Sequence, residues 1–232
     1  MSILYITATP IGNLEDISQR ALRILAEADL ILCEDTRTAK KLLDYYQIKT
    51  LTISYHQHSR LQKIEFIIDS LKKGRNLALI SDAGTPGISD PGNALIKEIT
   101  EKLSDQVKII PIPGPSALTA AASISGFPMD KFLFLGFPPT KRKRKKFFEE
   151  IVRQLADSKY PVIFYESPHR IIKSLKELEL EAKTYNLEPK ILACRELTKK
   201  FETIYRGTIR EVIKKIEKDI IKGEFTVIIN KA

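Results

Sequence analysis

The chain has 232 residues, 43% of them hydrophobic, and a formal net charge of +9. This length allows one large domain or two small ones, and the hydrophobic fraction is sufficient for a packed core. No apolar run approaches the roughly 18 residues that cross a membrane. The first residues, MSILYITATPIGNLED, lack a basic region ahead of the apolar stretch of a signal peptide. We therefore expect neither a membrane protein nor a secreted one, but a cytoplasmic protein.

The cysteines and histidines are few. Cys33 and Cys194 lie far apart in apolar, strand-like segments. They are expected to be reduced core residues rather than a disulfide or a metal pair. His56 and His58 have a spacing that would place both on one side of a strand. With no cysteine or third histidine nearby, no zinc site is expected, so we predict no metal.

Short apolar runs alternate with segments of helical period through the first half of the chain. Helices are expected between the runs, and Ser18 is a plausible cap for the first of them. This alternation predicts an α/β protein with a mostly parallel sheet and helices on both faces. The runs, which are the predicted strands, cover residues 3–7, 30–34, 51–55, 76–80 and 107–112.

Residues 81–92, SDAGTPGISDPG, form a glycine-rich loop directly after the predicted strand 76–80. A helix capped by Asp90, with Pro91 in its first turn, is expected to follow. Glycines let backbone amides approach a ligand, and ligands of open α/β sheets lie beyond the carboxyl ends of strands. The loop has neither a P-loop lysine nor GxGxxG, so it is not a standard nucleotide loop. The alternative is a tight turn that binds nothing.

A second domain is predicted to begin where Gly114 and Pro115 precede a helix of small residues. We assign residues 1–113 to an N-terminal domain and 114–232 to a C-terminal one. Two apolar runs of this half, 189–196 and 201–207, are too close for a crossover helix, so they should pair antiparallel and give a mixed sheet. The predicted strands of this half are residues 132–136, 161–166, 189–196, 201–207 and 225–230.

An uninterrupted basic run, KRKRKK, precedes a segment of helical period. Six like charges repel one another, so we expect the whole run to be solvated. Cations are also electrostatically unfavourable at a helix N-terminus, which favours a polyanionic partner. The alternative is a helix start that only increases solubility. The run should grip phosphates rather than read bases, and its members are Lys141, Arg142, Lys143, Arg144, Lys145 and Lys146.

Polar clusters fall where predicted strands end, and strand ends from two domains would converge on a cleft between the domains. Any one cluster alone could instead be a helix cap or a surface ion pair. The clusters are residues 9–12, 34–37, 81–82, 166–170 and 195–196.

Six motifs in order carry a family resemblance: TPIGNLEDIS, LCEDTR, SDAGTPGISDPG, PGPSALTAA, FYESPHR and CRELTKKFE. They strongly resemble the 16S ribosomal RNA 2′-O-methyltransferase I proteins of the tetrapyrrole methylase superfamily, the class III S-adenosylmethionine-dependent methyltransferases. The resemblance covers essentially the whole chain. It implies two α/β domains with S-adenosylmethionine in the cleft between them, and a homodimer. It also implies methylation of the ribose of a decoding-centre cytidine in the small ribosomal subunit.

The resemblance assigns the cofactor site residue by residue. Backbone amides of the glycine loop would bind the methionine carboxylate, and Tyr165 would flank the adenine. Since this cofactor has no phosphate, no P-loop lysine is needed. The positions that the resemblance places against the cofactor are Ile11, Asp82, Gly84, Thr85, Ile88, Ser116, Ala117, Tyr165, Cys194 and Thr226.

The reaction that the resemblance implies is in-line methyl transfer to a ribose hydroxyl. Asp35 and Glu166 are the candidates for a general base. Arg37, Arg170 and Arg195 would orient phosphates or these carboxylates. The alternative is that all five residues tie the two domains together.

Relatives in this family commonly carry a small helical C-terminal extension, whereas the sequence here stops at residues 230–232. The basic run would then carry a larger share of RNA binding.

Two other functions are possible. A superfamily relative could methylate a tetrapyrrole-like small molecule, and a non-catalytic ribosome-binding factor could keep the cofactor pocket as a sensor.

Overall fold

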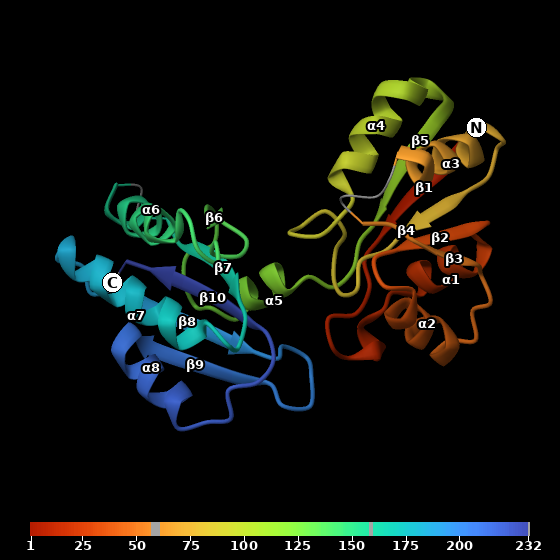
Figure 1. Ribbon diagram of the computed structural model, residues 1–232. Coiled ribbons are helices and arrows are strands. Elements are labelled where there is room, and N and C mark those ends of the chain that lie inside the picture. Colours follow the sequence, from red (N-terminus) through yellow and green to blue (C-terminus); the bar gives the residue numbers. More distant parts are fainter. Residues whose placement is uncertain (57–60, 158–159, 232) are drawn as a thin grey trace. The chain divides into compact units, whose positions relative to one another are not determined.

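The computed structural model describes residues 1–56, 61–157 and 160–231 (Figure 1). The chain forms two compact units, Met1–Ser116 and Ala117–Ala232. Each unit is built on one five-stranded sheet. In the part of the chain that is described, no helix is both long and apolar enough to cross a membrane.

The first unit is a parallel α/β domain, as the alternation of apolar runs predicts. Its strand order is β3-β2-β4-β1-β5, and every neighbouring pair is parallel. Two short 3-10 helices, Leu14–Asp16 and Ser104–Gln106, lie outside the main alternation. The main elements are β1 (Ser2–Thr7), α1 (Gln19–Glu27), β2 (Leu30–Cys33), α2 (Thr36–Tyr45), β3 (Thr52–Ser54), α3 (Leu61–Lys72), β4 (Leu77–Leu79), α4 (Asn93–Leu103) and β5 (Val107–Ile112).

Both faces of this sheet are covered by helices, which is why its strands are apolar at nearly every position. In β4, Leu77 and Leu79 face α3 and α4, whereas Ala78 between them faces α1 and α2. Figure 1 shows the two pairs of helices on opposite sides of the sheet. Since side chains alternate along a strand, one short apolar run serves both cores.

The two predicted helix caps of this unit have different outcomes. The Ser18 hydroxyl accepts a 3.1 Å hydrogen bond from the Ala21 N–H and caps α1, as expected. The prediction that Asp90 caps α4 is wrong, because the N-cap is Gly92, which has φ +146° and no side-chain bond. The loop turns once more at this glycine, where an added Cβ would lie 3.1 Å from Leu79 Cδ2. The helix therefore starts after Pro91 instead of at it.

The second unit has a mixed sheet of order β6-β7-β10-β8-β9. β6 and β7 are parallel, and the other neighbours are antiparallel, including the predicted β8–β9 pair. The elements are α5 (Ala117–Ser123), β6 (Leu133–Phe134), α6 (Arg144–Asp157), β7 (Val162–Glu166), α7 (Ile171–Thr184), β8 (Lys190–Arg195), β9 (Thr203–Thr208), α8 (Ile209–Glu217) and β10 (Phe225–Asn230).

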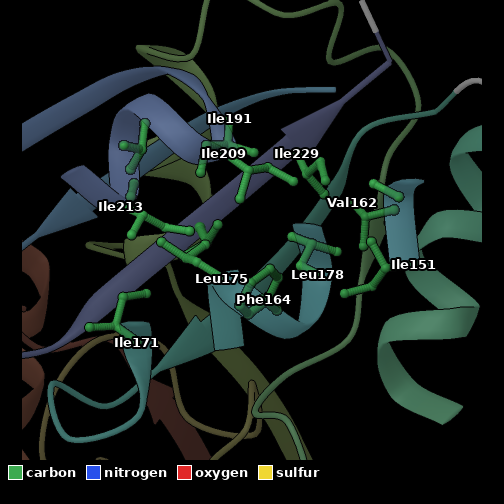
Figure 2. Close-up of a cluster of buried hydrophobic side chains, with 14 of the residues drawn as sticks. Ile151, Val162, Phe164, Ile171, Leu175, Leu178, Ile191, Ile209, Ile213 and Ile229 are labelled. Atoms are coloured by element: carbon green, nitrogen blue, oxygen red, sulfur yellow. The ribbon is translucent and has the colours of Figure 1, made fainter. Parts of the chain in front are cut away.

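The core of the second unit lies between one face of this sheet and the helices α6, α7 and α8 (Figure 2). Phe164 and Val227 point into it from adjacent strands. The intervening residues of the strands therefore face the other way. On that opposite face, Arg206 of β9 donates hydrogen bonds to the carbonyls of Ile124 and Ser125, just beyond α5. The small-residue helix α5 accordingly packs beside β10.

Candidate functional site

Two loops at the carboxyl edge of the first sheet are joined by backbone hydrogen bonds. Thr9 follows β1 and Gly84 follows β4, and the two residues form an isolated antiparallel bridge. The Thr9 N–H donates to the Gly84 carbonyl at 2.9 Å, and the Gly84 N–H donates back at 3.0 Å. The Thr9 hydroxyl also donates to the Ser81 carbonyl at 3.3 Å. The glycine-rich loop is thus fixed to the first strand at the edge where ligands of such sheets bind.

Gly84 is at the centre of the residues that the resemblance assigns to the cofactor. Its φ is +78°, and an added Cβ would lie 3.2 Å from Ile11 Cγ2. Next to it, the Thr85 hydroxyl donates to the Pro115 carbonyl at 3.1 Å, directly before Ser116. The predicted cofactor residues Ile11, Gly84 and Thr85, and Ser116 next to Pro115, are therefore brought to one edge of the first unit. Ile88, further along the loop, is 38% exposed.

Asp35 and Asp82 meet at the same edge. The Asp35 N–H donates to Asp82 Oδ1 at 3.0 Å. The Asp35 carboxylate caps α2 and binds the Arg37 guanidinium, with 2.6 Å between Oδ2 and Nη2. These hydrogen bonds from Arg37 lower the pKa of Asp35 to about 2. Asp35 is therefore an ionised carboxylate with its cation beside it.

The pKa of Glu34, the residue before Asp35, is shifted in the opposite direction. Glu34 belongs to the polar cluster 34–37, but the sequence assigns it no role. Its side chain is half-buried beside the carboxyl edge. Burial raises the pKa of Glu34, and the nearby Asp82 carboxylate raises it further. Two consecutive carboxyls thus have pKa values moved in opposite directions, Asp35 by a cation and Glu34 by burial and a like charge.

The predicted cofactor residues of the second unit form one row across its sheet. Thr226 of β10 is the register partner of Tyr165 in β7 and of Cys194 in β8. Directly opposed residues of antiparallel strands have side chains on the same face. This face is the one away from the core, and all three side chains of the row are neutral. Burial raises the pKa of the Cys194 thiol to about 12, so the thiol stays protonated.

Glu166, the residue after Tyr165, is completely buried and fully bonded. It accepts hydrogen bonds from the Ser167 N–H at 2.7 Å and from the Ser174 hydroxyl at 2.5 Å. It also pairs with Arg170 at 2.8 Å and with Arg144 at 3.9 Å. Both oxygens of this carboxylate are thus bound by groups of the second unit.

Ser174 is a member of this network that sequence reasoning does not single out. It is buried on the core-facing stripe of α7, between Ile171 and Leu178. A serine at an apolar position of a helix needs a polar partner. Its place in the apolar pattern of the segment could therefore have indicated a buried polar network.

Arg195 is likewise held inside the second unit. Its guanidinium is 3.4 Å from the Asp219 carboxylate and donates to the Thr203 hydroxyl at 2.9 Å. It also donates to the carbonyls of Phe201 and Ile220. These contacts connect three segments within the second unit, so they do not tie the two domains together.

The expectation that the whole basic run is solvated is wrong for Arg144. This side chain is buried and donates to Glu177 at 2.7 Å, to the Ser174 hydroxyl at 2.7 Å and to the Pro139 carbonyl at 3.2 Å. As the first residue of α6, it points to the same side as Phe148, one helical turn later. The remaining members of the run are exposed, namely Lys141, Arg142, Lys143, Lys145 and Lys146.

The cysteine prediction is confirmed, because Cys33 and Cys194 are both free and buried in strands. Of the two histidines whose spacing would place them on one side of a strand, His58 lies outside the described residues and His56 is exposed. Within the described ranges, no group of three or more histidine, cysteine, aspartate or glutamate residues is arranged to hold a metal.

Comparison with known proteins gives the same family for nearly the whole chain. The family model for tetrapyrrole (corrin/porphyrin) methylases matches residues 4–213. A protein of Vibrio cholerae named ribosomal RNA small subunit methyltransferase I is 44% identical over 230 residues, 98% of this chain and 77% of that protein. The chain belongs to the ribosomal RNA small subunit methyltransferase I family. It is therefore a methyltransferase of the tetrapyrrole methylase superfamily.

Other members of the ribosomal RNA small subunit methyltransferase I family match at similar levels. The Halalkalibacterium halodurans protein is 42% identical over 97% of this chain and 75% of its own length. The Thermotoga maritima protein is 39% identical over 99% of both chains.

Solved structures support the superfamily fold. A diphthine synthase has a TM-score of 0.75 at 14% identity, covering 99% of this chain and 90% of that one. The methyltransferase CobJ has a TM-score of 0.67 at 19% identity, covering 100% of this chain and 93% of that one. At these identities the likeness shows the fold alone, and the α/β prediction is confirmed.

The residues present fit S-adenosylmethionine, the cofactor that methylation in this family implies. Gly84 leaves space beside Ile11 that a Cβ would fill. The row Tyr165, Thr226 and Cys194 offers an aromatic ring, a hydroxyl and a protonated thiol, all neutral. This set suits a cofactor without phosphate groups.

Proposed function

We propose that this protein transfers a methyl group from S-adenosylmethionine to the ribose 2′-hydroxyl of a decoding-centre cytidine in small-subunit ribosomal RNA. The observation that carries the proposal is the identity of 39% to 44% with proteins named ribosomal RNA small subunit methyltransferase I, over at least 97% of the chain. The arrangement of the predicted site residues supports it.

The cofactor is proposed to contact residues of both units. In the first unit these are Ile11, Ser116 and the loop carrying Asp82, Gly84, Thr85 and Ile88. In the second they are Ala117, Tyr165, Cys194 and Thr226. S-adenosylmethionine, when bound, supplies a methyl group on a positively charged sulfur, which is already an activated leaving group. The protein's own contribution is to orient the hydroxyl, and orientation alone supplies about 7–11 kcal/mol in favourable cases.

Asp35 is the proposed acceptor of the hydroxyl proton, with Arg37 holding its carboxylate. Because the pKa of Asp35 is about 2, this carboxylate is a weak base. It would take the proton as the new bond forms rather than beforehand. Glu166, Arg170 and Arg195 are proposed to act through the fold of the second unit, since their charged groups are bonded within it. A positioned base contributes about 10²–10⁴-fold to the rate.

The RNA is proposed to contact the exposed cations of the basic run, which excludes Arg144. Phosphate contacts position a protein on RNA without reading its sequence. A homodimer and a cytoplasmic location are further parts of the proposal, drawn from the family resemblance. Sedimentation of the purified protein would test the dimer.

The test is incubation of purified small ribosomal subunits with methyl-labelled S-adenosylmethionine, followed by mapping of ribose methylation. Label on one cytidine of the decoding centre is expected. Label on a porphyrin precursor instead of on ribosomal RNA would contradict the proposal.

Asp35→Asn keeps a capping side chain for α2 and should slow single-turnover methylation at saturating cofactor. An unchanged rate would remove Asp35 as the proton acceptor.

A further inference from the structure

Phe137 is an exposed aromatic residue in contact with the proposed cofactor row. Its side chain is 48% exposed. The ring lies 5.4 Å from the ring of Tyr165, with 58° between the two planes. Tyr165 is also packed edge-on against Phe134 at 4.9 Å. Phe137 therefore has a fixed aromatic neighbour on one side and an open surface on the other.

The backbone directly after Phe137 is held by two arginines. Arg170 Nη1 donates to the Pro138 carbonyl at 3.2 Å, and Arg144 Nη1 donates to the Pro139 carbonyl at 3.2 Å. Both arginines pair with the buried Glu166. Two consecutive carbonyls are thus tied to one carboxylate at the end of β7. An exposed ring on such a support has little conformational freedom to lose on binding.

The surroundings of Phe137 in sequence are strongly basic. Lys141, Arg142 and Lys143 are exposed in the turn that follows. In the first turn of α6, Lys145 and Lys146 are exposed, and Lys145 lies 3.5 Å from Glu149. Positive charge therefore exceeds negative charge around this loop. An aromatic ring next to cations is the combination by which proteins bind single-stranded nucleic acid.

We propose that Phe137 is a stacking platform for an unpaired base of the RNA substrate. The inference rests on the proposed function and adds a positioning residue to it. Every base has a π-face, and RNA-binding proteins commonly stack unpaired bases on aromatic side chains. Because Phe137 touches Tyr165, a base stacked there would be held beside the residue proposed to flank the adenine. The basic run would hold the adjoining phosphates.

The chain contains no tryptophan, so Phe137→Trp introduces a single indole fluorophore at the platform. Its fluorescence is expected to be quenched when an RNA oligonucleotide spanning the decoding-centre target is added. Phe137→Ala should weaken binding of the RNA and raise KM for small subunits by about 5- to 150-fold, the range that one stacked base represents. Phe137→Trp should keep wild-type KM. Affinity for S-adenosylmethionine should be unchanged in both variants.

Phe201 provides the matched control. It is 66% exposed in the same unit, with Lys200 Nζ 5.7 Å from its ring. Phe201→Trp should show no quenching, and Phe201→Ala should keep wild-type KM. Unquenched fluorescence of Phe137→Trp together with a wild-type KM for Phe137→Ala would overturn the platform. A loss of cofactor affinity equal to the loss of RNA affinity would do the same, since Phe137 would then only support Tyr165.

The outcome for the platform is separable from that for the proposed function. If the wild-type protein methylates ribosomal RNA and Phe137→Ala does so with unchanged KM, the platform is wrong and the function stands. If the wild-type protein does not methylate ribosomal RNA, the proposed function fails. Quenching of the Phe137→Trp variant by RNA would still report stacking in that case.

Discussion

Thr9 and Gly84 exchange two backbone hydrogen bonds, 2.9 and 3.0 Å long, between loops that follow different strands. The bridge fixes the glycine-rich loop at a conformation with φ +78° at Gly84, close to Ile11. The shape of the proposed cofactor loop is therefore held by bonds within the protein.

Gly84→Ala should lower the free energy of unfolding by about 1–3 kcal/mol, because a Cβ is strained at this φ. It should also weaken binding of S-adenosylmethionine, since the Cβ would lie 3.2 Å from Ile11 Cγ2. Gly74→Ala is the control, with φ +83° and nothing within 4 Å of an added Cβ. Calorimetric titration and denaturant unfolding measure the two effects. Equal cofactor affinity in both variants would show that the Ile11 contact is irrelevant to binding.

Replacing the five exposed cations of the basic run with alanine, while keeping Arg144, should lower RNA affinity and flatten its dependence on salt. Removing one phosphate contact changes the slope of log K against log salt by about 0.7 for single strands. Binding of the cofactor should not change. The control replaces Lys72, Lys73 and Arg75, exposed cations at the end of α3 and just beyond it in the first unit. A wild-type slope in the first variant would exclude an RNA contact by the run.

Glu166→Gln should destabilise the protein by about 3–5 kcal/mol, because Arg144 and Arg170 lose their buried counter-charge. Glu179→Gln, which removes a surface pair with Lys183 at 3.1 Å, should change stability by no more than about 0.5 kcal/mol. Urea unfolding compares the two. If Glu166→Gln unfolds like the wild type yet loses its methylation rate, the role of general base returns to Glu166.

Tyr205 should make stability fall at alkaline pH. Burial first, and then its hydrogen bond to Asp219, raise the pKa of Tyr205 from its ordinary value of 10.0 to about 12. The folded protein thus holds this proton more tightly than the unfolded chain does. The resulting stabilisation is complete below pH 10 and is lost as the pH rises to about 12. Unfolding measured across this range should be less pH-dependent in Tyr205→Phe. In Tyr185→Phe, which alters an exposed tyrosine, the dependence should match the wild type.

Much of the fold follows from local patterns in the sequence. Each predicted strand has a counterpart within a few residues, because strands buried on both faces stand out as apolar runs. In the first sheet, the loops that follow the strands could be predicted to lie along one edge, since parallel strands end on the same side. The bridge between Thr9 and Gly84 confirms that two of those loops meet.

The sequence was less informative where a charge is satisfied by a distant partner. Arg144 looks like one of six equivalent cations, yet Glu166 and Glu177 enclose it. Its spacing from Phe148 and Ile151 places it on the buried stripe of α6. Its place on the buried stripe could be predicted from this spacing. The carboxylates of Glu166 and Glu177, which neutralise the buried charge, could not. The start of α4 was missed because the N-cap is Gly92, at φ +146° and with no side-chain bond, and not the capping residue Asp90 that the local pattern suggests.

The order of the strands affects how the protein folds during synthesis. β10 occupies the middle of the second sheet, between β7 and β8, although it follows all of that sheet's other strands in the chain. The first unit is complete once Ser116 has been made and can fold while translation continues. β7 and β8 must wait for Phe225–Asn230 to emerge before they are joined. A nascent chain stalled before that strand would expose two unpaired strand edges, and such edges are prone to aggregation.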